Sequence, residues 1–86
     1  MNCFVQVMYN VRTGTREEEI EVDLEWNDMY SNPSKVAVMS AIEIVVERHF
    51  PTEVTLMKPS DINQINNSCF YSYRSSTGRQ FYAKVS

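Results

Sequence analysis

The sequence predicts an α+β fold of two layers, in which one helix packs on one face of a mainly antiparallel sheet in the order ββαβββ. Three observations predict it: two N-terminal segments alternate apolar and polar residues, a central segment has helical periodicity, and both glycines follow threonine between strand-like segments. The 86 residues are expected to form a single domain, 1–86. The hydrophobic fraction of 43% and the charged fraction of 22% are typical of a globular chain.

Alternation with period two predicts an N-terminal hairpin. The apolar set in residues 3–11 is Cys3, Val5, Val7, Tyr9 and Val11, and the set in residues 17–26 is Ile20, Val22, Leu24 and Trp26. Gly14 suits the turn because glycine adopts positive φ without steric strain. A turn at Thr13-Gly14 would pair Val5 with Val22 and place both apolar sets on one face.

The central segment is predicted to be a helix that begins near "YSNPS" (30–34). Asn32 can cap it and Pro33 suits its first position. One broad arc of the helical wheel is apolar apart from a terminal histidine: Val38, Met39, Ala41, Ile42, Val45, Val46 and His49. The helix is expected to end at "HFP", because Pro51 disfavours helical backbone at Phe50.

The C-terminal part is predicted to add three strands. We expect "TEVTLMKP" (52–59) to be the third strand and "SDINQINN" (60–67) to be a polar connection with one helical turn capped by Ser60. The segments "SCFYSYR" and "RQFYAKVS" flank "SSTG" and predict a second hairpin around Gly78. Its register stays open. A turn at Thr77-Gly78 mixes the apolar faces, whereas a three-residue loop aligns them and turns Phe70 and Tyr82 away from the helix.

Acidic residues occupy alternate positions of the second predicted strand: Glu17, Glu19, Glu21, Asp23 and Glu25. Because residues i and i+2 of a strand point the same way about 6.7 Å apart, these acids would form a row roughly 27 Å long on the face away from the helix. In the register above, the row faces Phe4, Gln6, Met8 and Asn10, none of which is a cation. The row is either a solvated face that discourages aggregation or a surface for a basic partner. Phosphates of a nucleic-acid strand lie roughly 7 Å apart, a spacing that such a row could imitate.

Charge is also polarised along the chain, whose formal net charge is −3. Residues 1–30 hold seven acids and two bases, a net −5, whereas residues 62–86 hold three bases and no acid, a net +3. Within the basic segment, an aromatic and basic hairpin (69–84) is typical of surfaces that stack single-stranded nucleic acid. The residues that would carry this alternative function are Phe70, Arg74, Arg79, Tyr82 and Lys84.

No catalytic, metal or cofactor motif is found in the sequence. His49 is the only histidine, and it is expected to pack or to cap the helix C-terminus. Cys3 and Cys69 lie far apart within apolar strand patterns, match no ligand spacing and are expected to behave as small buried hydrophobes. With two glycines, the chain has no phosphate-binding loop. We therefore expect no enzymatic activity, no metal and no cofactor.

The order of strand, helix and "HFPTEVTLMKP" between Glu21 and Pro59 resembles the layout of small phage proteins that inhibit bacterial RNA polymerase. Small, acidic domains without catalytic motifs are also common among phage-encoded blockers, anti-CRISPR proteins included. The resemblance implies a protein that acts by binding another protein. It assigns no role to an individual residue.

The sequence thus favours a non-enzymatic inhibitor or modulator whose acidic strand face occupies a basic, nucleic-acid-binding surface on a larger protein. The expected contact residues are Glu17, Glu19, Glu21, Asp23 and Glu25, flanked by Phe4 and Met8. A homodimer, with the acidic half of one copy against the basic end of another, is a further alternative. Because the chain has neither a long apolar run nor a signal-peptide pattern, we expect no membrane partner and a cytoplasmic location.

Overall fold

The alternating N-terminal segments form a hairpin of β1 (Asn2–Val11) and β2 (Gly14–Asp23). The structure is a computed structural model that describes residues 2–24, 33–53 and 57–85. Val5, Val7, Ile20 and Val22 are buried, and the intervening residues of β2 from Glu17 onward mostly face solvent. The period-two alternation therefore predicted the face of each described residue correctly, and Trp26 of the predicted apolar set lies outside the described residues.

The register of this hairpin differs from the prediction by two residues. Val5 lies opposite Ile20, and Val11 lies opposite Gly14, so that Arg12 and Thr13 form the turn. Gly14 has φ +140° and occupies the first position of β2 in place of the second turn position. Because side chains repeat every two residues, a shift of two leaves every side chain on its predicted face and changes only its cross-strand neighbour.

The helix α1 (Pro33–His49) begins and ends where the sequence predicts. Its cap residue, Asn32, lies outside the described residues. The buried side chains form one stripe along the helix: Ala37, Val38, Ala41, Ile42, Val45 and Val46. The helix ends at His49, and the backbone N–H of Phe50 donates to the carbonyl of Val46 at 2.7 Å.

The predicted strand at 52–59 is wrong in its described part. Pro51–Glu53 is a 3-10 turn, and a second 3-10 turn spans Pro59–Asp61; residues 54–56 lie outside the described residues. Proline fixes φ near −65°, which suits the first position of such a turn. In the second turn the Asp61 carboxylate accepts a hydrogen bond from the backbone N–H of Lys58 at 2.9 Å, and Ser60 lies within the turn instead of capping it.

The third strand is β3 (Asn63–Gln64), two residues within the segment predicted to be a connection. A tight turn with positive φ at Asn66 (51°) and Asn67 (54°) joins it to β4 (Phe70–Arg74). Asparagine tolerates this left-handed backbone better than most residues. The order ββαβββ is therefore confirmed, although a different segment supplies the third strand.

The second hairpin pairs β4 with β5 (Gln80–Val85) in the register that aligns the faces. Tyr73 lies opposite Phe81, and the backbone N–H of Ser75 donates to the carbonyl of Arg79 at 2.9 Å, so the loop is Ser76-Thr77-Gly78. Gly78 supplies a φ of +89°. Phe70 and Tyr82 consequently face away from the helix, whereas Tyr73 and Phe81 are buried.

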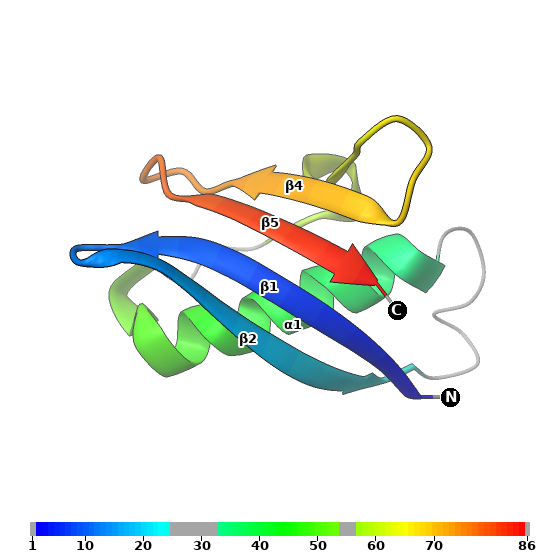
Figure 1. The fold of residues 1–86 in the computed structure, drawn as a ribbon, viewed down its shortest axis with the longest axis horizontal. Coiled ribbons are helices and arrows are strands. Elements are labelled where there is room, and N and C mark those ends of the chain that lie inside the picture. Colours follow the sequence, from blue (N-terminus) through cyan, green and yellow to red (C-terminus); the bar gives the residue numbers. More distant parts are fainter. Residues whose placement is uncertain (1, 25–32, 54–56, 86) are drawn as a thin grey trace.

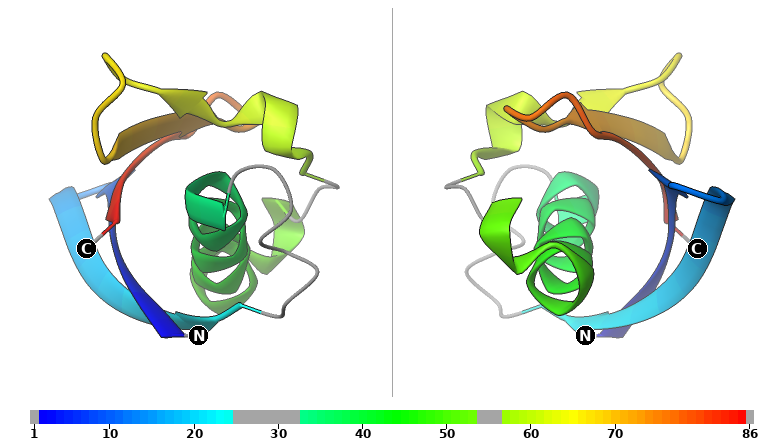
Figure 2. Two further views of the ribbon diagram at one scale, coloured as in Figure 1. Left: turned by 90° about the vertical axis from the view of Figure 1, so that its right-hand side faces the viewer. Right: turned by 90° about the vertical axis from the view of Figure 1, so that its left-hand side faces the viewer.

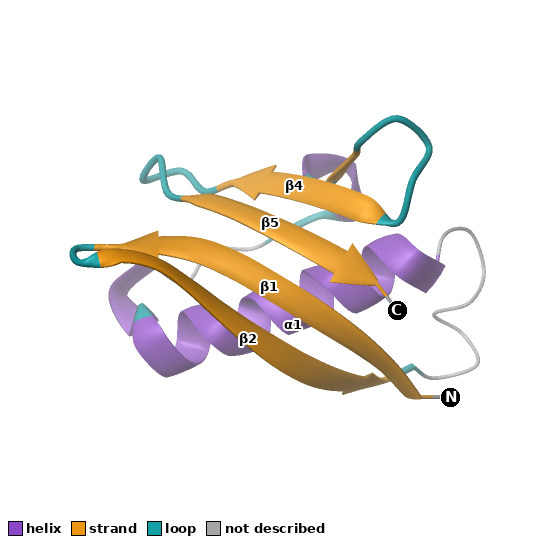
Figure 3. Ribbon diagram, viewed as in Figure 1, coloured by secondary structure: helices purple, strands orange, loops and turns teal. Residues whose placement is uncertain are grey.

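All five strands form one antiparallel sheet in the order β2-β1-β5-β4-β3, and α1 covers one face of it (Figures 1 and 3). The sheet curves around the helix, so its other face is convex (Figure 2). The core lies between the helix and the concave face and includes Val5, Tyr9, Ile42, Ile62 and Phe81.

Ile42→Ala should destabilise the protein by about 2–5 kcal/mol, because Ile42 is 0% exposed and its truncation leaves a cavity between helix and sheet. Ile65→Ala removes the same atoms from a side chain that is 37% exposed and should cost much less. Urea unfolding of the two variants measures the difference. Equal destabilisation would contradict the placement of α1 on the sheet.

Candidate functional site

The outer face of the sheet, meaning the face away from α1, carries the predicted acids. Glu17, Glu19, Glu21 and Asp23 are exposed side chains at alternate positions of the edge strand β2. We call these four residues the acidic stripe. Glu25, the fifth acid of the predicted row, lies outside the described residues. Because alternate residues of a strand are about 6.7 Å apart, the four acids extend over roughly 20 Å.

The cross-strand neighbours of the acidic stripe carry no charge. Met8 lies opposite Glu17, Gln6 opposite Glu19, Phe4 opposite Glu21 and Asn2 opposite Asp23. The Asn2 amide donates to the Glu21 carboxylate, with an Nδ2–Oε1 distance of 2.7 Å. Within the described residues no ion pair involves the carboxylates of Glu17, Glu19 or Glu21.

Glu18 is not part of the acidic stripe, because it points to the helix side of the sheet. Its carboxylate accepts a hydrogen bond from the Tyr9 hydroxyl at 2.6 Å and lies 2.9 Å from His49 Nε2 and 3.6 Å from Arg48 Nη1. The Tyr9 hydrogen bond and the nearby His49 and Arg48 lower the pKa of Glu18, against the opposing effect of burial. This cluster ties β1 and β2 to the C-terminal end of α1, which is the packing role expected for His49.

Exposed apolar side chains are spread across the outer face, from Phe4 on β1 to Ile65 directly after β3. Among the described residues, four large apolar side chains are strongly exposed: Phe4 (43%), Ile65 (37%), Phe70 (40%) and Tyr82 (47%). Met8 lies opposite Tyr82, which lies in turn opposite Ser72 on β4. The backbone N–H of Ile65 donates to the Phe70 carbonyl at 2.9 Å, and this bond continues the β3–β4 ladder. Ile65 therefore lies opposite Phe70 and on the same face of the sheet. The sequence did not single out Ile65, because "NQINN" has no strand periodicity.

The outer face also separates charge of opposite sign. Lys84 lies opposite Gln6 on β1 and Phe70 on β4, and its Nζ is 5.6 Å from the centre of the Phe70 ring. Arg74, exposed at the end of β4, follows Phe70 and Ser72 on the same face. The acidic stripe therefore lies at one side of the face, and Lys84 and Arg74 lie toward the other.

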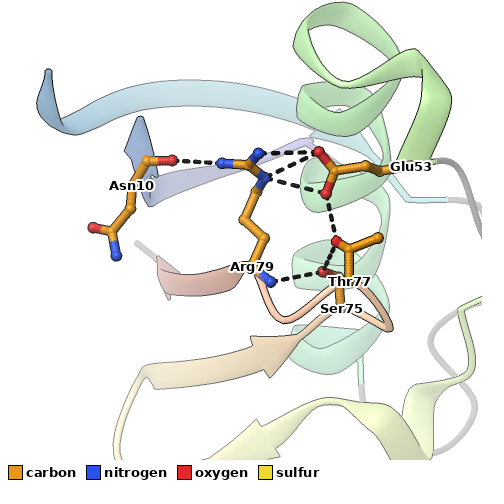
Figure 4. A network of polar contacts seen from close by, with 5 residues as sticks. All are labelled: Asn10, Glu53, Ser75, Thr77 and Arg79. Carbon is orange, nitrogen blue, oxygen red and sulfur yellow. Dashed lines mark hydrogen bonds and ion pairs between the residues drawn. The ribbon is translucent and has the colours of Figure 1, made fainter. Parts of the chain in front are cut away.

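Arg79, which was predicted with the aromatic and basic hairpin, is held elsewhere (Figure 4). Its guanidinium contacts Glu53 with an Nη2–Oε2 distance of 3.0 Å, and its Nη1 donates to the backbone carbonyl of Asn10 at 2.7 Å. The Cζ atom lies 3.7 Å from the centre of the Phe50 ring. Arg79 thus connects β1, the residues after α1 and the β4–β5 loop, and it does not join Phe70 and Tyr82 on the outer face.

The hydroxyl of Thr77 completes this network by donating to Glu53 Oε1 at 2.6 Å, and Ser75 Oγ lies 2.8 Å from Thr77 Oγ1. The hydrogen bond from Arg79, and to a smaller extent the one from Thr77, lowers the pKa of Glu53. An open depression of 510 Å³ lies against the network, between Asn10 and Gln80. Glu53 and Arg79 are 26 positions apart in sequence, so no local pattern could have predicted this pair.

Two further findings concern the described residues. No group of three or more histidine, cysteine, aspartate or glutamate side chains among them could hold a metal ion. None of their helices has the length and apolar character required to cross a membrane.

Comparison of the chain with protein-family models, curated proteins and solved structures gives no match. The predicted strand–helix–strand order between Glu21 and Pro59, which resembles phage inhibitors of RNA polymerase, lacks its last strand in the described residues. We therefore infer function from the geometry and charge of the outer face.

Glu53→Gln should lower the free energy of unfolding by about 1–3 kcal/mol at pH 7, because it removes a charge-assisted contact with Arg79. The folded-state pKa of Glu53 is below its ordinary value of 4.5, so this stabilisation is present above about pH 4.5 and is lost as pH falls through the folded pKa. Urea unfolding of wild type and variant from pH 7 to pH 3 should show the difference narrowing at low pH. A constant difference would contradict the ionic origin. The matched control is Glu47→Gln, which makes the same chemical change at an exposed position of α1.

Proposed function

We propose that this protein is a small, non-enzymatic inhibitor or modulator that binds a basic, nucleic-acid-binding surface of a larger protein through the β1–β2 part of its outer face. The acidic stripe supplies the charge, and Phe4 and Met8 supply apolar contact. In this role it would act as a cytoplasmic blocker of the phage or anti-CRISPR kind.

The observation that carries the proposal is the arrangement of the acidic stripe. Its carboxylates are exposed, lie on an edge strand and have uncharged cross-strand neighbours. Their spacing of about 6.7 Å is close to the roughly 7 Å between successive phosphates of a nucleic-acid strand. A groove that binds phosphates in a row therefore offers cations at a spacing that fits these acids.

Two further features favour a protein partner over a purely solvated face. Phe4, directly opposite Glu21, is 43% exposed, and apolar side chains within a charged surface are typical of interfaces. The outer face is also convex (Figure 2), and a convex ridge is complementary to a groove. Electrostatic steering of such an encounter should make association fast and sensitive to salt.

The titratable clusters of the inner side support a binding role in place of catalysis. Among the described residues, the carboxylates whose pKa is lowered are Glu18 and Glu53, and each joins separate elements of the fold through hydrogen bonds and ion pairs. These contacts explain both pKa shifts as consequences of packing.

Glu19→Lys combined with Glu21→Lys should abolish capture of a nucleic-acid-binding protein from lysate of the organism that encodes the chain, because the reversed charges repel a basic groove. Immobilised wild type and variant are compared at 50 and 150 mM salt, and captured proteins are identified by mass spectrometry. Free single-stranded or duplex nucleic acid should release the partner from the immobilised wild type. The nucleic acid and the acidic stripe would compete for the same basic surface of the partner.

The matched controls are Glu19→Lys and Glu47→Lys, which change the net charge equally but lie on the outer face and on α1, respectively. Only Glu19→Lys should weaken capture. Equal capture by the wild type and the double variant would show that the acidic stripe is a solvated face. Thermal unfolding establishes that each variant is folded.

A further inference from the structure

We propose that the β4–β5 part of the outer face is a second binding surface, whose ligand is single-stranded nucleic acid. This inference goes beyond the proposed function, because it concerns a different ligand and residues outside the acidic stripe. Phe70 and Tyr82 would stack two bases, and Lys84 and Arg74 would contact the phosphates.

The two aromatic side chains have the arrangement that base stacking requires. Phe70 is 40% exposed and Tyr82 is 47% exposed, and both lie on the outer face of adjacent strands. Phe70 lies opposite Lys84, so Tyr82 is its diagonal neighbour, about 7–8 Å away. Successive nucleotides of an extended strand are separated by a similar distance, roughly 7 Å. Two neighbouring bases can therefore each meet one ring.

The two cations of this surface lie on the same face as the rings. Lys84 Nζ is 5.6 Å from the centre of the Phe70 ring, and exposed Arg74 is on the same face of β4. The sequences of β3, β4 and β5 contain no acidic residue. An exposed contact between a cation and a ring is weaker than base stacking, so a base can displace Lys84 from Phe70 while the ammonium turns to a phosphate.

Some aromatic and basic residues of the β4–β5 hairpin are not available to a ligand. Tyr71 and Tyr73 are buried in the core, and Arg79 is held by Glu53. The surface therefore provides two rings and two cations, and it fits two or three nucleotides. Double-stranded nucleic acid does not fit, because its bases are already stacked on one another.

The acidic stripe limits the extent of this site. Glu17, Met8 and Tyr82 lie in one row across the sheet, which places Glu17 two strands, or about 10 Å, from Tyr82. This distance is about one Debye length at 0.1 M salt, so the acids repel phosphates that extend past β5 toward β1. With two phosphate contacts, log K should fall against log salt with a slope of about −1.4.

The test is a titration of the 15N-labelled protein with hexathymidylate at 50 mM salt, in which NMR records the backbone amide chemical shifts at each step. Saturable shifts should centre on β4 and β5. Phe70→Leu and Tyr82→Leu should each weaken binding roughly 5- to 150-fold, because each removes one stacking platform. Glu17→Gln combined with Glu19→Gln should strengthen binding about twofold per carboxylate. A 12-base-pair duplex should bind more weakly than the single strand.

Phe4→Leu is the matched control, since Phe4 is an equally exposed aromatic residue of the outer face beside the acidic stripe. It should leave hexathymidylate binding unchanged. Lack of saturable binding at millimolar oligonucleotide, or equal weakening by Phe4→Leu, would overturn the proposal. Shifts of β4 and β5 that depend on protein concentration without oligonucleotide would overturn it in favour of a second copy of the chain. None of these outcomes depends on the protein partner of the acidic stripe.

Discussion

A single helix can cover only one face of a five-stranded sheet, and this constraint shapes the whole molecule. The apolar residues of alternate strand positions, from Val5 on β1 to Phe81 on β5, pack under α1. The other half of every strand must then face water or a partner. The described elements of this 86-residue chain form no second layer over the outer face. The side chains of that face are therefore the ones available for contacts with a ligand.

Alternation along each strand decides which charges face outward, and the ion pairs of the inner side engage charges that face inward. Glu18 is held by Tyr9 and His49, and Arg79 is held by Glu53. These contacts connect both hairpins to the C-terminal end of α1. On the outer face, the acids on β2 are separated from Lys84 on β5 and Arg74 on β4, with apolar side chains between them. Charge segregation on the outer face thus follows from the alternation within each strand and from the strand order β2-β1-β5-β4-β3.

The sequence allowed prediction of the fold class and of the faces of β1 and β2, because both follow from alternation and helical periodicity. It left the faces of β4 and β5 open between two registers and did not predict β3 as a strand. Cys69, which was expected to be buried, is exposed. The first register was wrong by two residues because alternation fixes parity and not pairing; the choice between turns at Arg12-Thr13 and Thr13-Gly14 depends on the backbone of Gly14. Residues 52–59 resemble a strand in composition, yet the prolines at both ends favour 3-10 turns.

For the candidate site, the same alternation placed Phe4, Met8 and the acidic stripe together on one face, as the structure does. It could not predict the partners of Arg79 or Glu18, because both side chains contact residues that are distant in sequence. Nor could it reveal Ile65, whose position depends on a turn with two left-handed asparagines. Local patterns predict which face a residue occupies, whereas long-range polar contacts decide which charges are available to a ligand.

The size of the outer face decides whether its two proposed surfaces could bind their ligands at the same time. The five strands contain 10, 10, 2, 5 and 6 residues, and at about 4.8 Å by 3.3 Å per residue they present on the order of 500 Å². A standard protein interface buries about 800 Å² of each partner. A protein whose interface of that size began at the acidic stripe and stayed on the outer face would extend beyond β1 and β2 and also cover Phe70 and Tyr82. Protein and single-stranded nucleic acid would then exclude one another, and release of the target would be what exposes the aromatic surface.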